Sequence, residues 1–213
     1  MSYQVSEQLL SYNRPRTPLN PQGIVIHDTD TPGATAQNEH DYFNSADRQA
    51  SAHYFVDWTQ IIQTIPDNEI SWGCGPTGNS KFLNIEMCVP VIPALFQDVW
   101  DRTVWLVASL CVKYGWSTGP NVYSHNGISQ MYHETGHTDP YAFLQNNGKT
   151  WEQLLTAIDT KIAELKAPVE VVVPTQDPDP DVYLSVRVRT SKADALVQQI
   201  INLGYACKRL DLA

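Results

Sequence analysis

A proline- and aspartate-rich stretch at residues 166–181 constrains the fold of this chain more than any other feature. It reads KAPVEVVVPTQDPDPD, and its four prolines and its lack of a helical period indicate an extended, solvated linker. The linker separates a first domain over residues 1–165 from a small module over residues 182–213. Only the first domain is long enough to bury a core comfortably, because a short chain hides a smaller share of its surface.

Helix and strand patterns alternate through the first domain. Short apolar runs bounded by turn residues predict strands at residues 23–27, 52–56, 61–65 and 82–89. Apolar residues at helical spacing predict helices at residues 35–44, 96–114 and 151–165. Thr35 is placed to cap the first helix, Gly115 to end the second, and Thr150 to cap the third. The interleaving indicates an α/β fold with a mixed central β-sheet flanked by helices.

Composition and charge exclude several classes of protein. Hydrophobic residues make up 42% of the chain, which excludes wholesale disorder. The 14 Lys and Arg residues face 23 Asp and Glu residues, and the resulting net charge of −9 argues against nucleic acid or an anionic membrane as the main partner. No stretch of the sequence approaches the roughly 20 apolar residues of a membrane span.

The first residues and the cysteines bear on where the chain is made. The start, MSYQVSEQLL, has neither the basic region nor the apolar run of a secretory signal, so we expect synthesis in the cytoplasm without a signal peptide. The four cysteines form no CxxC pair and lie in apolar or aromatic neighbourhoods. We therefore expect buried, reduced thiols and no disulfide framework.

Polar residues interrupt the apolar runs at positions that could carry chemistry. His27 ends the first strand, Glu86 lies inside an apolar run at residues 83–89, and His125 follows a short Val-Tyr-Ser approach. A buried carboxylate is costly unless something in the fold uses it. The segment His133-Glu-Thr-Gly-His137-Thr-Asp139-Pro140 is dense in side chains that bind metals or move protons.

Each of these residues also has a structural interpretation. A histidine at a strand end is often only hydrogen-bonded, and the His/Asp segment could be a solvated loop. Strand alternation places Asn84 and Glu86 on one face, which could point outward from an edge strand. Taken together, however, two distant histidines and an aspartate can complete a zinc site with three protein ligands and one open position. The sequence contains no HExxH motif, which excludes the thermolysin-type arrangement.

Five separated motifs carry a family resemblance. They are Ile24-Val-Ile-His27-Asp-Thr, Ser51-Ala-His-Tyr-Phe-Val-Asp57, Ile70-Ser-Trp72, Asn84-Ile-Glu86-Met-Cys88 and His137-Thr-Asp139-Pro140. In order and rough spacing they resemble the type 2 N-acetylmuramoyl-L-alanine amidases, relatives of the peptidoglycan recognition proteins that are common in bacteriophage endolysins. The resemblance extends over about residues 20–160, and the agreement of five motifs makes it specific.

The resemblance implies a set of site residues. A zinc ion would be held by His27, His125 and Asp139, since the third ligand in this family is Cys or Asp. Glu86 would be the catalytic glutamate. His137 occupies a position usually held by Lys or Thr, where it would stabilise the oxyanion. His53 lies in a shared motif without binding metal, so we interpret it as structural.

Two departures from the family pattern bear on the site. The family usually has Trp-His-x-Gly after the second strand pair, whereas this chain has Trp72-Gly-Cys-Gly75, which would alter a substrate contact near the cleft. The interval from His125 to Asp139 is also longer than is typical. His133 lies in that longer interval and is therefore the rival metal ligand.

The resemblance implies the substrate as well. The reaction would be hydrolysis of the amide between N-acetylmuramic acid and L-alanine of the stem peptide in peptidoglycan. Trp72, Trp58 and Tyr54 could stack on sugar or peptide, with a core role expected for at least two of them. The favoured origin is a phage endolysin that lyses a Gram-positive host and acts on the cell wall after release. The alternatives are a host autolysin and a non-catalytic muropeptide-binding protein; retention of three ligand types together with Glu86 favours an enzyme.

The C-terminal module has a βαβ pattern. Residues 182–189 alternate like a strand, residues 191–203 follow a helical period that ends before Gly204, and residues 205–210 form a second strand-like run. The pattern resembles half of a SPOR module, a fold that binds peptidoglycan glycan strands. Half a module leaves a sheet edge exposed, so two tails could pair into a homodimer. Docking of the tail on its own catalytic domain is the alternative.

Overall fold

The computed structural model describes residues 2–174, 183–189 and 208–210. The chain divides into two compact units, Met1–Lys161 and Ile162–Ala213, and each unit is described by itself. Among the residues described, no helix is both long enough and apolar enough to cross a membrane.

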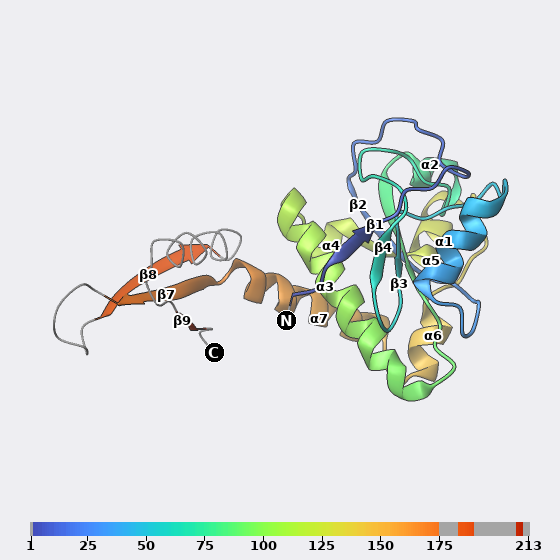
Figure 1. Ribbon diagram of the computed structural model, residues 1–213. Helices are drawn as coiled ribbons and strands as arrows, with labels where there is room; N and C mark the ends of the chain where they lie inside the picture. Colours follow the sequence, from blue (N-terminus) through green and yellow to red (C-terminus); the bar gives the residue numbers. More distant parts are fainter. Residues whose placement is uncertain (1, 175–182, 190–207, 211–213) are drawn as a thin grey trace. The chain divides into compact units, whose positions relative to one another are not determined.

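A six-stranded sheet forms the centre of the first unit (Figure 1). Its strands are β1 (Val5–Glu7), β2 (Gly23–Asp28), β3 (Tyr54–Val56), β4 (Ile61–Gln63), β5 (Phe82–Met87) and β6 (Val122–Ser124). Their order across the sheet is β1-β4-β3-β5-β2-β6. The β3–β4 pair is antiparallel and the other four pairs are parallel, so the expectation of a mixed central sheet is confirmed.

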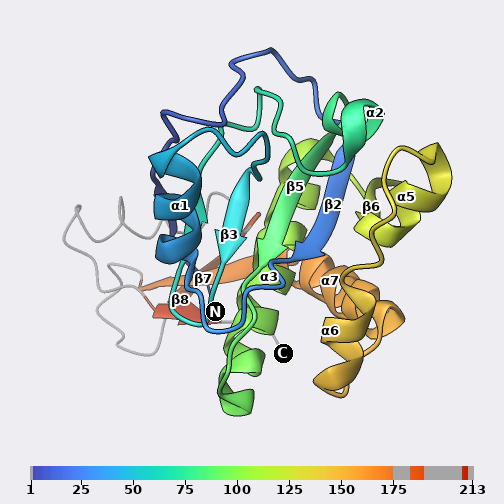
Figure 2. The same cartoon turned by 90° about the vertical axis from the view of Figure 1, so that its right-hand side faces the viewer.

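Helices cover both faces of this sheet. They are α1 (Ala36–Ser45), α2 (Gly75–Asn79), α3 (Phe96–Tyr114), α4 (Thr118–Asn121), α5 (His125–Tyr132), α6 (Tyr141–Asn146) and α7 (Trp151–Lys166), with a 3-10 turn, η1, at Pro93–Leu95. Figure 2 shows α1 and α5 on the side of the sheet that faces the viewer and the long helix α3 behind it. The sheet therefore lies between two helical layers, as expected for this fold class.

Side-chain alternation divides the core between the two faces. On the α3 side, Ile24 and Ile26 of β2 and Leu83 and Ile85 of β5 are fully buried. The opposite face of these strands packs in part against α2 and α5, through a buried cluster of Val25, Cys74, Phe82 and Ile128. His27 of β2 and Asn84 and Glu86 of β5 lie on this second face, because they alternate with the apolar residues of the first.

The helix ends follow the local signals in the sequence. Thr35 caps α1, with its side chain accepting from the backbone N–H of Asn38. Helix α3 ends at Tyr114, and Gly115 follows in the left-handed conformation with φ 73°. Thr150 and Gln153 form the reciprocal capping pair of α7. The three predicted helices are therefore confirmed nearly to the residue.

Cys74 and Cys88 are buried free thiols, as expected, and Cys111 is also buried. The fourth, Cys207, lies outside the described residues.

The second unit contains a three-stranded antiparallel sheet in the order β8-β7-β9. Its strands are β7 (Pro168–Pro174), β8 (Tyr183–Arg189) and β9 (Lys208–Leu210). Strand β7 occupies part of the segment expected to be a linker, because its Val-Glu-Val-Val-Val run is rich in β-branched residues that favour strands. β8 and β9 fall where two tail strands were expected, and the intervening helix prediction lies outside the described residues.

Candidate active site

The ends of three adjacent parallel strands position the site. His27 lies near the end of β2, and Glu86 faces it in register on β5. His125 begins α5 directly after β6, the other neighbour of β2. The carboxyl ends of parallel strands meet at one edge of a sheet, where open α/β sheets bind their ligands. Strand β5 lies inside the sheet, so Glu86 does not point outward from an edge strand.

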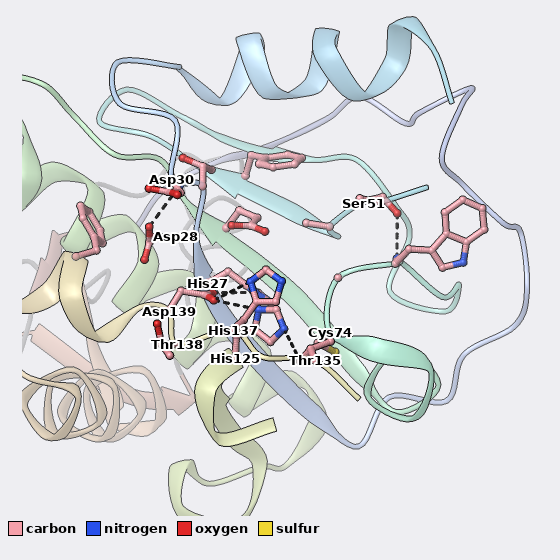
Figure 3. A pocket seen from close by; sticks show the side chains of 18 of the residues that line it. His27, Asp28, Asp30, Ser51, Cys74, His125, Thr135, His137, Thr138 and Asp139 are labelled. Atoms are coloured by element: carbon pink, nitrogen blue, oxygen red, sulfur yellow. Dashed lines mark hydrogen bonds and ion pairs between the residues drawn. The ribbon is translucent and has the colours of Figure 1, made fainter. Parts of the chain in front are cut away.

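Asp139 joins the two histidines from the loop after α5 (Figure 3). The Nδ1 atoms of His27 and His125 are 3.0 Å apart. Asp139 reaches both rings, with Oδ2 3.2 Å from Nδ1 of His27 and Oδ1 3.1 Å from Nδ1 of His125. The ligand atoms of these three residues lie within 4.8 Å of one another. Two imidazole nitrogens and one carboxylate form a donor set that fits zinc and leaves a coordination position open.

His133 does not belong to this cluster. It follows the last turn of α5 as an exposed cap residue in the left-handed conformation, with φ 56°. The structure therefore places the rival ligand outside the group formed by His27, His125 and Asp139.

Each histidine of the cluster is held through its second ring nitrogen. Nε2 of His27 is 2.9 Å from Oδ1 of Asn84, and Nε2 of His125 is 3.3 Å from Oγ1 of Thr135. Such partners orient the ring and leave the other nitrogen free for a metal. Sequence reasoning missed both positioning residues, although alternation had already placed Asn84 on the same face as Glu86.

Glu86 is a partly buried carboxylate with one fully buried oxygen. Its Oε2 has no hydrogen-bond partner in the described part of the chain. Burial raises the pKa of Glu86 to about 7; the charge of His27 opposes this shift, and that of Asp139 adds to it. A carboxylate with a pKa near neutrality can both accept and release a proton at physiological pH.

The pKa values of Asp139 and its neighbour Asp28 are shifted in opposite directions. Burial favours the neutral form of Asp139, but its close contacts with the rings of His125 and His27 outweigh burial and hold its pKa well below the usual range. Asp28, beside the cluster, has its pKa raised to about 6 by burial and then by the charge of Asp139. Of the two carboxylates, Asp139 is therefore the one that stays ionised.

His137 lies at the edge of the same cluster. Its ring stacks on that of His125, with centroids 4.3 Å apart and an interplanar angle of 12°. Its Nδ1 is 3.6 Å from Oδ1 of Asp139, and 65% of its side chain is exposed. The ring is thus held beside His125 and Asp139 and is open to a bound molecule.

The cluster opens into a cleft of about 1380 Å³, which is large enough for an extended ligand. Trp72 lines this cleft and is 37% exposed. Of the other aromatic candidates, Tyr54 is buried and donates to Asp67, and Trp58 packs against the core. The expectation that at least two of the three have core roles is confirmed.

Comparison with known proteins identifies the family. Residues 17–142 match the family model Amidase_2, described as N-acetylmuramoyl-L-alanine amidase. The chain belongs to this family. It is 30% identical over 148 residues to the bifunctional autolysin of Staphylococcus aureus, a match that covers 66% of this chain and 12% of the autolysin. The chain thus spans only a small part of the length of the curated relatives it matches.

Solved structures of relatives share the fold of this amidase-family chain. The Staphylococcus aureus hydrolase AmiA, solved in complex with its ligand, superposes with a TM-score of 0.71 at 27% identity, covering 76% of this chain and 85% of AmiA. The catalytic domain of XlyA superposes with a TM-score of 0.62 at 26% identity, covering 73% of this chain and 99% of that domain.

The long loop after α5 is anchored at several points in this family member. Glu134 accepts hydrogen bonds from the backbone N–H and the hydroxyl of Thr77 at the start of α2, at 2.8 and 2.6 Å. Next to it, Thr135 bonds to Ser129 at 2.6 Å and reaches His125. These contacts fasten the loop that carries Thr135 and Asp139.

Proposed function

We propose that this chain is a zinc-dependent hydrolase of the amide between N-acetylmuramic acid and L-alanine of the peptidoglycan stem peptide. The observation that carries the proposal is the pairing of Glu86 with the cluster of His27, His125 and Asp139. Among the described residues, one carboxylate oxygen of Glu86 is buried without a hydrogen-bond partner, and Glu86 lies in register with His27 of the cluster. Membership of the amidase family supports the same reaction.

The metal would supply one part of the chemistry. Zinc held by His27, His125 and Asp139 polarises a bound carbonyl and makes a bound water more acidic. The ionised Asp139 and the two neutral imidazoles are the forms that such a site needs.

Glu86 is the proton carrier in this proposal. Its pKa of about 7 lets the carboxylate accept a proton from the attacking water at Oε2. The protonated carboxyl then donates that proton to the leaving nitrogen of L-alanine. The acid and base roles thus fall on one residue, whose burial tunes it for both.

His137 stabilises the charge that develops on the carbonyl oxygen. Its exposed ring lies against His125 at the mouth of the cluster, where a ring N–H can face a bound substrate. A single donor to an oxyanion contributes about 3 kcal/mol to lowering the barrier.

The proposed setting is the bacterial cell wall. For its biological role, we propose a phage endolysin that lyses a Gram-positive host. It would act on the wall after release from the cell that made it. A host autolysin with the same chemistry is the alternative, and the similarity to the Staphylococcus aureus bifunctional autolysin supports it.

Digestion of purified Gram-positive walls tests the activity. We expect new L-alanine amino termini without new reducing sugar ends, and loss of the reaction when the metal is removed. Zinc content is measured in parallel for Glu86→Gln, because this variant keeps all three ligands. A Glu86→Gln protein that binds zinc and still cuts at the wild-type rate would contradict the proposed mechanism. Muropeptide binding without any cleavage by wild type would instead indicate a recognition protein.

A further inference from the structure

A chain of buried hydrogen bonds runs from His27 away from the metal cluster into the core. Nε2 of His27 lies 2.9 Å from Oδ1 of Asn84, and Nδ2 of Asn84 lies 2.8 Å from Oγ of Ser71. Oγ of Ser71 is 2.9 Å from Nδ1 of His53, whose Nε2 is 2.9 Å from the backbone oxygen of Glu69. The four side chains are at most 2% exposed, so water does not compete for these bonds.

The contact between His53 and the backbone oxygen of Glu69 fixes which atom donates in each hydrogen bond of this series. The backbone oxygen of Glu69 only accepts hydrogen bonds, so Nε2 of His53 carries the proton. Nδ1 of His53 accepts from the backbone N–H of Asn84 at 2.9 Å and is therefore unprotonated. Burial lowers the pKa of His53 to about 4, which keeps the ring neutral at physiological pH.

The donor and acceptor of each following hydrogen bond can then be assigned in turn. Because Nδ1 of His53 accepts, the hydroxyl of Ser71 donates to it and its oxygen accepts from the amide NH2 of Asn84. The amide oxygen of Asn84 is left facing His27, so Nε2 of His27 is the protonated nitrogen. Nδ1 of His27 keeps its lone pair on the side of His125 and Asp139.

A glycine makes room for this arrangement. A Cβ atom at Gly73 would lie 2.8 Å from Cγ and 2.9 Å from Oδ1 of Asn84, which is closer than real Cβ contacts come. Gly73 therefore leaves the space that the side chain of Asn84 occupies.

We propose that Asn84 is a positioning residue for the metal site, anchored through Ser71 to His53 and accommodated by Gly73, and that it presents His27 to the metal through Nδ1. The inference rests on the proposed metal-dependent function. It goes further by assigning the nitrogen of His27 that binds and the residues that select it.

Nitrogen NMR of the zinc-loaded full chain determines directly which ring nitrogen of His27 is protonated and which binds zinc. Long-range 1H–15N correlations distinguish a protonated ring nitrogen from a metal-bound one. We expect Nε2 of His27 to be protonated and Nδ1 to bind zinc. Binding of zinc through Nε2 of His27 would overturn the inference but leave the proposed function intact. A wild-type chain that binds no zinc would instead overturn the proposed function.

Zinc affinity of variants, measured by competition with a chromophoric chelator, tests the role of Asn84. Asn84→Leu removes the acceptor and is expected to weaken zinc binding by about 10- to 100-fold, the usual effect of losing such a partner. Gly73→Ala is expected to act in the same direction, because its Cβ displaces Asn84. Asn84→Asp keeps an acceptor for Nε2 of His27 and is expected to restore affinity to about the wild-type level.

Thr64→Val is the matched control. Thr64 is buried beside His53 and donates to the backbone oxygen of Ala52, outside the chain of bonds that ends at His27. We expect this variant to lose stability and keep its zinc affinity. The inference is wrong if Asn84→Leu binds zinc like wild type, if Asn84→Asp fails as badly as Asn84→Leu, or if Thr64→Val weakens zinc binding equally.

Discussion

At the scale of single residues, Glu86 combines features that a purely structural residue would avoid. It is a carboxylate on an interior strand, in register with His27, and its Oε2 has no partner in the region that the structure describes. Its raised pKa means that folding opposes its ionisation. The ionised carboxylate therefore lowers the free energy of unfolding, as is common for residues at functional sites.

Substitution of Glu86 should separate stability from activity. The folded-state pKa of about 7 lies above the ordinary value of 4.5, so the ionised carboxylate destabilises the metal-free fold increasingly as pH rises from 4.5 through 7. We expect Glu86→Gln to raise the free energy of unfolding of the metal-free protein at pH 8 by on the order of 2 kcal/mol. Amide hydrolysis should fall by about 100-fold or more.

Urea unfolding and wall digestion measure these two effects. Glu7→Gln is the control, because Glu7 lies on the exposed edge strand β1 and should change neither quantity. A Glu86→Gln protein that is less stable than wild type at pH 8 would show that the carboxylate has stabilising partners.

His53 should make the fold sensitive to acid. Burial lowers its pKa from 6.5 to about 4 in the folded chain, so the unfolded chain binds a proton first as pH falls. The stability that neutral His53 contributes is complete above pH 6.5 and is lost progressively between pH 6.5 and 4. We expect the free energy of unfolding to fall over this interval by up to about 3 kcal/mol from this residue.

Urea titrations of the full chain at several pH values provide the measurement. His53→Gln is expected to be less stable at pH 7 and to show a flatter dependence between pH 6.5 and 4. An unchanged slope in His53→Gln would assign the acid sensitivity to other groups.

At the scale of secondary-structure elements, local signals account for the helix ends. Thr35 caps α1 and Gly115 ends α3 at the predicted positions, because each effect depends only on neighbouring residues. The short helices α2 and α4 have too few residues to show a helical period, and they form where tertiary contacts hold them.

Replacement of Gly115 tests the local control of the end of α3. Its φ of 73° is unfavourable for any residue with a Cβ, although no atom lies within 4 Å of the position where that Cβ would stand. We expect Gly115→Ala to lower the free energy of unfolding by about 1 kcal/mol through backbone strain alone.

Gly119→Ala is the matched control, because Gly119 also has open space around it and lacks a positive φ. Thermal or urea unfolding should show no loss of stability for Gly119→Ala. Equal effects of the two substitutions would exclude left-handed strain as the cause.

At the scale of the whole molecule, net charge has a consequence for association with the substrate. The chain carries −9, and Gram-positive walls are themselves anionic. Like charges repel over distances comparable to the Debye length, so added salt should strengthen wall binding. Cosedimentation with purified walls at increasing salt concentration measures this, and weaker binding at high salt would indicate a local basic contact that dominates the net charge.

The C-terminal unit carries the prediction about assembly. We expect the full chain to be a dimer at tens of micromolar if two tails pair, and a chain that ends at Lys166 to be a monomer. Sedimentation velocity of both proteins decides between pairing and docking of the tail on its own catalytic domain. Two monomers would exclude pairing.

Much of the fold and of the candidate site could be predicted from the sequence, because the signals concerned are short in range. Short apolar runs located β2 and β5, and helical spacing located α1, α3 and α7. The motif resemblance pointed to His27, His125, Asp139, Glu86 and His137, all of which the structure brings to one cleft. The strand β7 within the expected linker and the edge strand β1 did not stand out from their surroundings.

Local patterns in the sequence located the longer helices and several strands, the caps of three helices and the residue types of the site. Only the tertiary structure decided that β5 lies inside the sheet, that His27 and Glu86 are in register, and that Asn84 holds His27 while Gly73 leaves it room. The physical reason is that capping and alternation depend on neighbours along the chain. Strand order, register and buried hydrogen bonds depend instead on groups that only folding brings together.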